Sequence, residues 1–187
     1  MVLLFKQEKE TGFTLIELLT VIFIISLLIS LSVPNFSIIK ERARITAQKV
    51  NMHNVAVAVE NYYFEKGEYT DYFYEDDYGA YFPGGDPDAD PPIGGKLPTN
   101  PWTGEELEPD NFNPDWYDTP DAVVNTDVGG PNDDYDYEPG EMRFGTYSPP
   151  GTGRVQLWGL IGMDRNGTSI RGFDATTSQV VIFVVHN

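Results

Sequence analysis

Oxygen-bearing side chains near the C-terminus have a spacing that suits a hard cation. Asp164 and Asn166 stand at alternate positions, and Asp174 follows further along the chain. Calcium-binding loops offer carboxylate and amide oxygens in this way. An EF-hand is not indicated, because Ala175 stands near the place of its twelfth-position Glu. The residue pattern fits either a calcium site at Asp164, Asn166 and Asp174 or a hairpin whose tight turn is Asn166-Gly167.

Other groups that could do chemistry are sparse or isolated. The two histidines, His53 and His186, lie far apart in the sequence, and there is no cysteine. No phosphate-binding loop, HExxH motif or nucleophile–base spacing is present, so the sequence predicts no enzyme. Two clusters of aspartates could bind cations, but a solvated acidic surface is the simpler interpretation of both. They are Asp86, Asp88 and Asp90, and Asp133, Asp134 and Asp136.

Glu17 stands at the edge of a long apolar segment. No charged residue occurs from Leu18 to Ile39, and at about 1.5 Å per residue this segment spans roughly 33 Å as a helix. That length matches the hydrocarbon core of a bilayer. A carboxylate in such a segment costs on the order of 2.5–3.5 kcal/mol. Glu17 therefore needs a function and a partner, which a plain membrane anchor does not supply.

The elements around this segment follow from charge and periodicity. A charged leader, residues 1–12, precedes the apolar segment, and a polar amphipathic segment, residues 40–66, extends the helix to a stop at Gly67. One face of that extension is predicted to pack on the rest of the protein. The residues of this face are Ile45, Met52, Val55, Val59 and Tyr63.

The remainder changes character after Gly67. Residues 68–153 are rich in Tyr, Asp, Gly and Pro, which predicts long ordered loops with at most short strands. Residues 155–161 and 179–185 are apolar and β-branched and are predicted to be strands. The expected fold is α+β, with one long helix at about 14–66 packed on a small antiparallel sheet. Without disulfides, aromatic packing or a bound cation must order the loops.

Charge is strongly segregated. The formal net charge is −17, and residues 71–141 contain Lys96 as their single base. The segment 40–49 is instead net basic. An acidic surface of this kind repels phosphate groups, so no specific binding of nucleic acid is predicted.

The segment Gly12-Phe13-Thr14-Leu15-Ile16-Glu17-Leu18-Leu19 resembles the processing motif of type IV pilins and of the pseudopilins of type II secretion. The resemblance extends to about Asn61. It implies cleavage between Gly12 and Phe13 by a prepilin peptidase and N-methylation of Phe13. It also implies that Glu17 guides subunit docking and that Pro34 kinks or locally melts the helix in a filament. Leu97–Gly104 resembles the proline-rich segment that many pilins carry before their sheet, where Trp102 could fix the loop to the helix.

The resemblance implies a pilin-like organisation: a cleaved leader (1–12), a transmembrane and filament-core helix (13–39) and a globular head (40–187). The expected function is a major pilin-like subunit of a type IV pilus. Its partners would be further copies of the chain in a helical filament, the prepilin peptidase and an assembly platform in the inner membrane. The precursor would lie in that membrane and the filament outside the cell. A periplasmic major pseudopilin is the alternative, followed by a membrane-tethered binding module that does not polymerise.

Overall fold

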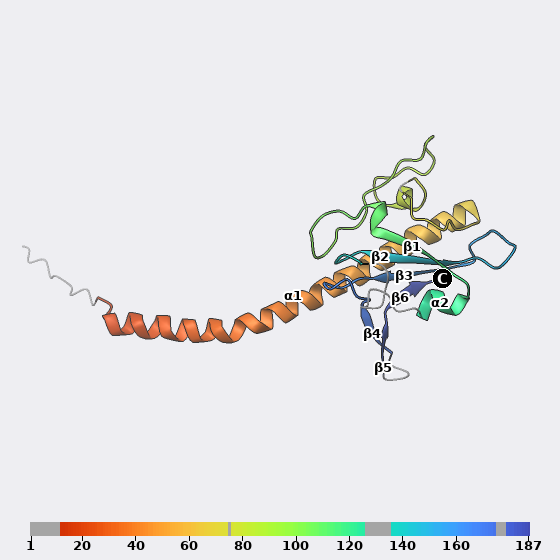
Figure 1. Cartoon of the computed structure of the whole chain (residues 1–187). Coiled ribbons are helices and arrows are strands. Elements are labelled where there is room, and N and C mark those ends of the chain that lie inside the picture. Colours follow the sequence, from red (N-terminus) through yellow and green to blue (C-terminus); the bar gives the residue numbers. More distant parts are fainter. Residues whose placement is uncertain (1–11, 75, 126–135, 175–178) are drawn as a thin grey trace, which may run out of the picture. The chain divides into compact units, whose positions relative to one another are not determined.

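The computed structural model describes residues 12–74, 76–125, 136–174 and 179–187. The chain divides into two compact units, one ending at Arg42 and the other running from Ala43 to Asn187, here called the head. Helix α1, Leu15–Lys66, contributes to both units (Figure 1). It ends as predicted at Gly67, whose φ of 75° is left-handed and whose N–H donates to the Tyr63 carbonyl at 2.8 Å.

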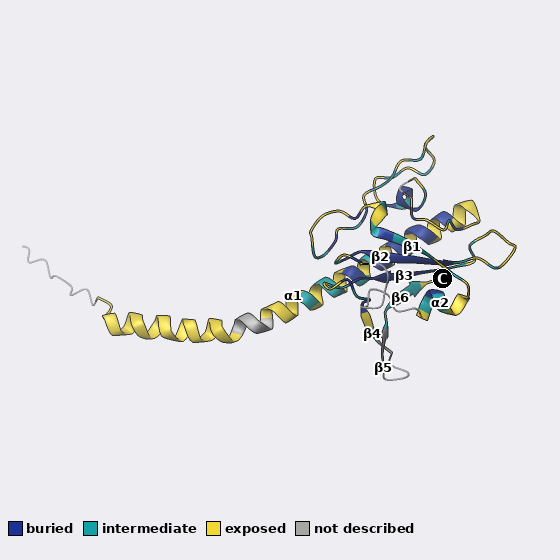
Figure 2. Ribbon diagram, in the orientation of Figure 1, coloured by how far each residue is buried: buried dark blue, intermediate teal, exposed yellow. Residues whose placement is uncertain are grey.

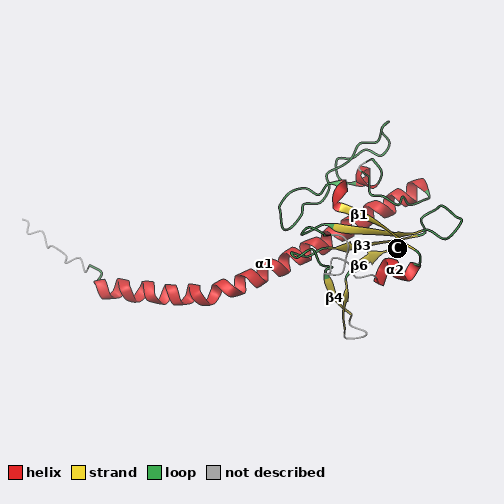
Figure 3. Cartoon of the chain, in the orientation of Figure 1, coloured by secondary structure: helices red, strands yellow, loops and turns green. Residues whose placement is uncertain are grey.

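The head contains a four-stranded sheet and a separate two-stranded hairpin (Figure 3). The main sheet has the order β1-β2-β3-β6. Its strands are β1 Phe112–Tyr117, β2 Met142–Tyr147, β3 Leu157–Gly162 and β6 Val184–His186. The hairpin consists of β4 Arg171–Asp174 and β5 Gln179–Ile182. Short helices are η1 Tyr78–Tyr81, η2 Pro109–Asn111 and α2 Pro120–Asn125.

The α+β class is confirmed, but the sheet is mixed and not purely antiparallel. Strand β1 runs parallel to β2, with Phe112 opposite Met142, whereas β2–β3 and β3–β6 are antiparallel. Both β1 and β2 lie within the region predicted as loops. Pro114 weakened the strand pattern of β1, yet proline is tolerated on an edge strand, and β1 is at the edge.

The two apolar segments near the C-terminus form strands, as predicted, but they do not both join one sheet. Residues 157–162 are β3, in the middle of the main sheet. The second segment divides at Phe183, whose N–H donates to the Ile170 carbonyl at 2.8 Å. Its first part pairs with β4 in the separate hairpin, and its last part pairs with β3.

The core lies between the head segment of α1 and the main sheet (Figure 2). Met52, Val55 and Val59 are buried as predicted, and they pack with Phe144 and Leu160. Ile45, also predicted for this face, is half-buried. Tyr63 was predicted wrongly, since it is 43% exposed and Tyr62 is buried in its place. The buried stripe steps by three residues from Val59 to Tyr62, where the prediction took four.

Aromatic rings order the segment that follows α1. Phe73 stacks on Phe112 with ring centroids 4.0 Å apart, and Tyr78 lies 4.9 Å from Tyr62. The Tyr78 hydroxyl accepts from the Thr70 N–H at 2.8 Å and donates to the Thr70 carbonyl at 3.0 Å. Burial of large rings with satisfied hydroxyls can therefore hold a proline-rich segment without disulfides.

Candidate assembly site

Gly12, Phe13 and Thr14, the described residues before α1, are exposed and have no regular secondary structure. Gly12 has no positive φ, and a Cβ added to it would meet no atom within 4 Å. Phe13 is 81% exposed. Neither backbone conformation nor packing in the described part of the chain requires glycine at position 12. The conformation leaves the Gly12–Phe13 bond accessible to another protein.

Thr14 and Glu17 form a reciprocal cap at the start of α1. The Glu17 Oε2 atom accepts from the Thr14 N–H at 2.9 Å and from the Thr14 hydroxyl at 2.7 Å. The Glu17 N–H donates to Thr14 Oγ1 at 3.3 Å. This is a capping box. The sequence signal was the Thr-x-x-Glu spacing before an apolar segment, which the sequence analysis did not use.

The two carboxylate oxygens of Glu17 have different roles in this arrangement. Both donors of Thr14 are on Oε2, and Oε1 makes no hydrogen bond to any residue that the structure describes. A carboxylate can accept at both oxygens. Glu17 can therefore keep its helix-capping bonds while it accepts a further donor at Oε1.

The unit before Ala43 exposes apolar side chains on every side of α1 (Figure 2). The helix is long and apolar enough to cross a membrane. Its hydroxyl groups are satisfied within the helix. Thr20 donates to the Ile16 carbonyl at 2.8 Å, and Ser26 donates to the Ile22 carbonyl at 2.7 Å. Such internal bonds allow hydroxyls to lie in an apolar environment without loss of hydrogen bonding.

Two further predicted features are only partly covered by the described residues. Pro34 lies within α1, but the side chains of residues 32–35 lie outside the description, and the role of Pro34 in a filament stays a prediction. The leader, apart from Gly12, also lies outside the described residues.

Two asparagines hold the proline-rich segment 97–104, one to α1 and one to the segment before β2. The side chain of Asn51 on α1 donates to the Thr99 carbonyl at 2.9 Å. Asn100 is buried, donates to the Pro139 carbonyl at 2.8 Å and accepts from the Trp102 N–H at 2.9 Å. Trp102, the residue predicted to fix this loop, is half-buried, whereas neither asparagine was predicted.

Asp164 and Asn166, two of the predicted calcium residues, lie in one turn, and Asp174 ends β4. Asp164 Oδ1 accepts from the N–H of Asn166 at 2.7 Å and from the N–H of Thr168 at 3.2 Å. The Thr168 carbonyl accepts from the Asp164 N–H at 2.8 Å. The side chain of Asp174 lies outside the described residues. Among those that are described, no three His, Asp or Glu side chains are grouped to hold a metal, and calcium stays a prediction.

The comparisons with known proteins agree with the N-terminal features. Residues 9–33 match the family model "Prokaryotic N-terminal methylation motif". The type IV major pilin protein PilA of Myxococcus xanthus (strain DK1622) is 34% identical over 66 residues. That match covers 35% of this chain and 30% of PilA, so the chain spans less than a third of its relative. No solved structure matches the chain.

The methylation motif, the match to a major pilin and the fold of one long N-terminal helix with a small sheet agree with one another. The chain therefore carries a prokaryotic N-terminal methylation motif and is similar to a type IV major pilin over part of its length.

Proposed function

We propose that the chain is processed between Gly12 and Phe13 and polymerises through residues 13–39 as a major subunit of a type IV pilus. Pilins are structural proteins, and the family accounts for the motif. The observation that supports polymerisation most directly is the carboxylate of Glu17. It caps the start of a helix that is apolar all round.

Processing would create the donor that Glu17 can accept. Cleavage after Gly12 leaves an α-ammonium group on Phe13, one residue before the capping Thr14. In a bundle of apolar helices an unpaired carboxylate is costly, and a charged partner with hydrogen bonds offsets that cost. The Phe13 ammonium of a neighbouring copy supplies such a partner for Oε1. Only the assembled state then satisfies Glu17 fully.

The helix surface explains how one sequence serves two environments. In the precursor, lipid covers the apolar side chains, and the inner membrane holds the chain. In the filament, the same side chains pack against helices of other copies. A repeated contact between different surfaces does not close on itself and gives a helical fibre. The prepilin peptidase and an inner-membrane assembly platform would act between the two states, and the filament would extend outside the cell.

Glu17→Ala separates assembly from insertion. We expect the variant to enter the membrane at least as well as the wild type, since a costly charge is removed. Sheared surface filaments should fall by at least about tenfold, in line with the loss of a buried charged pair. Glu105→Ala, in the exposed part of the head, is the matched control and should change neither fraction.

The outcomes distinguish the candidate functions. Abundant normal filaments from Glu17→Ala would contradict the docking role of Glu17. Membrane-bound wild type without any filament would instead support the tethered module. Filaments that remain within the periplasm and accompany secretion would favour a major pseudopilin of type II secretion.

A further inference from the structure

The turn at residues 164–168 carries a pattern that the proposed filament function does not use. Its sequence is Asp164-Arg165-Asn166-Gly167-Thr168. Asn-x-Thr without proline at the middle position is the acceptor pattern for attachment of a glycan to asparagine. Asp164 extends this pattern, because bacterial oligosaccharyltransferases accept an asparagine that has an acidic residue two positions before it. The turn therefore contains a complete five-residue acceptor sequence.

The fold holds this sequence as a closed turn at the surface of the head. An antiparallel bridge between Met163 and Ser169 closes the turn at its base. Within it, the Asp164 N–H donates to the Thr168 carbonyl at 2.8 Å. Asn166 lies midway between these two residues and is exposed. The acceptor asparagine is thus at the tip of the turn.

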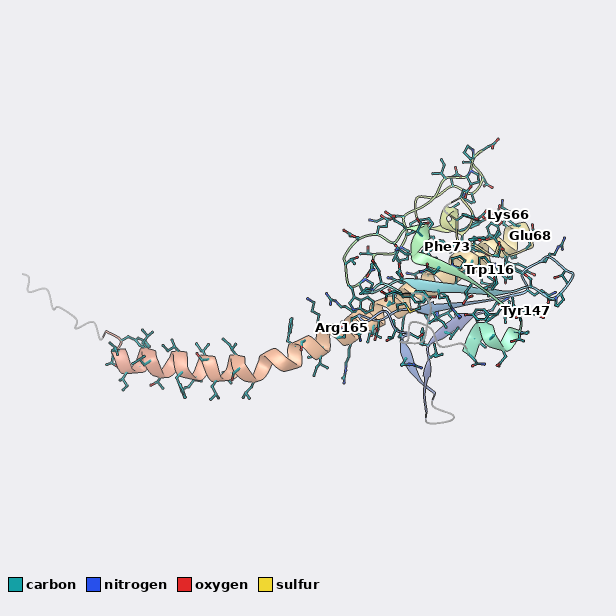
Figure 4. The ribbon with its side chains drawn as sticks, viewed as in Figure 1. Lys66, Glu68, Phe73, Trp116, Tyr147 and Arg165 are labelled. Carbon is teal, nitrogen blue, oxygen red and sulfur yellow. The ribbon has the colours of Figure 1, made fainter. Side chains whose placement is uncertain are left out.

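The side-chain amide of Asn166 is available to a group from outside the head. It makes no hydrogen bond to any residue that the structure describes. The preceding residue, Arg165, is also exposed, and Figure 4 shows it at the edge of the head, far from Trp116. A transferase can therefore reach the amide without displacing packed side chains.

The needs of the turn explain only part of its sequence. Gly167 has a φ of 69°, and an added Cβ would lie 2.0 Å from the Tyr137 carbonyl oxygen, so this position requires glycine. Asp164 is explained by the two backbone N–H groups that its Oδ1 accepts. The amide of Asn166 and the hydroxyl of Thr168 have no hydrogen-bond partner among the described residues. These are the two groups that the short acceptor pattern specifies.

A second triplet of the short kind provides a comparison within the same chain. Asn35-Phe36-Ser37 lies inside α1, where backbone N–H and C=O groups bond to one another along the helix. Val33 stands two positions before Asn35, in place of an acidic residue. The proposed function also places this segment in a membrane or a fibre. Of the two triplets, the one in the turn alone combines the full pattern with an exposed position.

We propose that Asn166 is an N-glycosylation site whose sugar donor is an oligosaccharide carried on a polyprenyl pyrophosphate lipid. The amide nitrogen of Asn166 attacks C1 of the first sugar, so a C–N bond forms and the C1–O bond to the pyrophosphate breaks. The lipid pyrophosphate leaves with the bonding electron pair, and the amide nitrogen loses one proton to a base of the transferase. The inference rests on the part of the proposed function that carries the head across the membrane, because such transferases act on its outer side.

Peptide mass spectrometry of the full chain, isolated from the membranes of its own cells, tests the site. Trypsin can release residues 166–171 between Arg165 and Arg171. We expect this peptide to carry the mass of an oligosaccharide, with fragment spectra that place the sugar on Asn166. The peptide that contains Asn35 should carry none.

Matched substitutions separate the acceptor pattern from the turn. Asn166→Gln should remove the glycan completely. Asp164→Asn keeps an oxygen that can accept the bonds of the turn but removes the acid, and it should lower occupancy at least about tenfold. Asp164→Glu keeps the acid and should retain the glycan. Thr168→Val, which lacks the hydroxyl, should lower occupancy at least about tenfold, whereas Thr168→Ser should retain most of it.

Two kinds of result would overturn the inference. One is an unmodified Asn166 in the wild type. The other is a glycan that persists in Asn166→Gln or Asp164→Asn, or that fragment spectra place on a hydroxyl such as that of Thr168, since the sugar would then be attached by another chemistry.

The same samples keep this inference distinct from the proposed function. A chain that begins at Phe13, forms surface filaments and is unmodified at Asn166 leaves the filament function standing and rejects the glycosylation site. A chain that carries the glycan on Asn166 but forms no filament does the reverse.

Discussion

Arg143 is a fully buried cation on the face of the main sheet that α2 covers. Its guanidinium lies 4.7 Å from the centre of the Tyr117 ring, donates to the Val123 carbonyl at 3.0 Å and lies 3.7 Å from Asp115 Oδ2. Burial lowers the pKa of Arg143 to about 10, against the opposing effect of Asp115. Arg143 thus connects β1, β2 and α2 at one point.

Removing Arg143 should destabilise the head. Arg143→Ala leaves a cavity and an unpaired Val123 carbonyl, and we expect a loss of about 3 kcal/mol in the free energy of unfolding. Arg143→Met refills most of the volume with apolar atoms and should cost about 1 kcal/mol. Denaturant unfolding of the detergent-solubilised chain measures both. Equal stability of wild type and Arg143→Ala would show that the guanidinium contributes nothing net.

At the scale of elements, the long helix was the easiest part to predict. Its length, its apolar segment and the stop at Gly67 are local signals, and α1 follows them to within one residue at its start. Strands β1 and β2 were harder to predict because their stability comes from pairing across the sheet. Phe112 and Met142 lie opposite each other in the sheet though distant in the sequence. Local composition, rich in Pro and Asp, indicated long loops and allowed short strands without locating them.

In the candidate assembly site, too, only residues with local sequence signals could be predicted. Gly12, Phe13 and Glu17 were predicted from a contiguous motif, which the family model also matches. The Thr14–Glu17 cap was also contiguous and could have been found from its spacing. In contrast, Asn51 and Asn100 act through carbonyls distant in sequence. A polar residue on a helix or in a loop gives no local sign of such a partner.

Close packing between β3 and α1 gives a prediction about glycine. A Cβ at Gly162 would lie 2.9 Å from Sδ of Met52 and 3.1 Å from Cγ of Gln48. Gly162→Ala should therefore cost about 1–3 kcal/mol by overpacking. Gly172→Ala in β4 is the matched control, because its Cβ would meet Phe183 only at 3.5 Å, an ordinary contact. A shift of the unfolding midpoint for Gly172→Ala but not for Gly162→Ala would contradict the packing.

The buried tyrosines make stability sensitive to alkaline pH. Burial, assisted by Asp77 and Glu68, raises the pKa of Tyr62 from 10.0 to about 12. The folded state therefore holds this proton more tightly than the unfolded state, and the stabilisation is complete below pH 10 and lost between pH 10 and 12.

Arg143, whose pKa is lowered, acts in the opposite direction over that range. The useful quantity is therefore the difference in unfolding free energy between wild type and Tyr62→Phe. As the pH rises from 10 to 12, the wild type should lose stability relative to Tyr62→Phe. A difference independent of pH would show that the Tyr62 hydroxyl titrates normally in the folded protein.

Across the whole molecule, the two units differ in what they expose. The unit before Ala43 supplies an apolar helix whose start is capped by the Glu17 carboxylate. The head supplies a folded body in which a mixed sheet packs on the second part of α1.

Mass spectrometry of sheared surface filaments tests the central claim most directly. We expect this chain to be the main component, to begin at Phe13 and to carry a methyl group on its N-terminus. Cleavage there creates the ammonium group on which the docking of Glu17 depends. A chain in the filament that still begins at Met1, or that begins after a small residue near Ser32, would contradict the account.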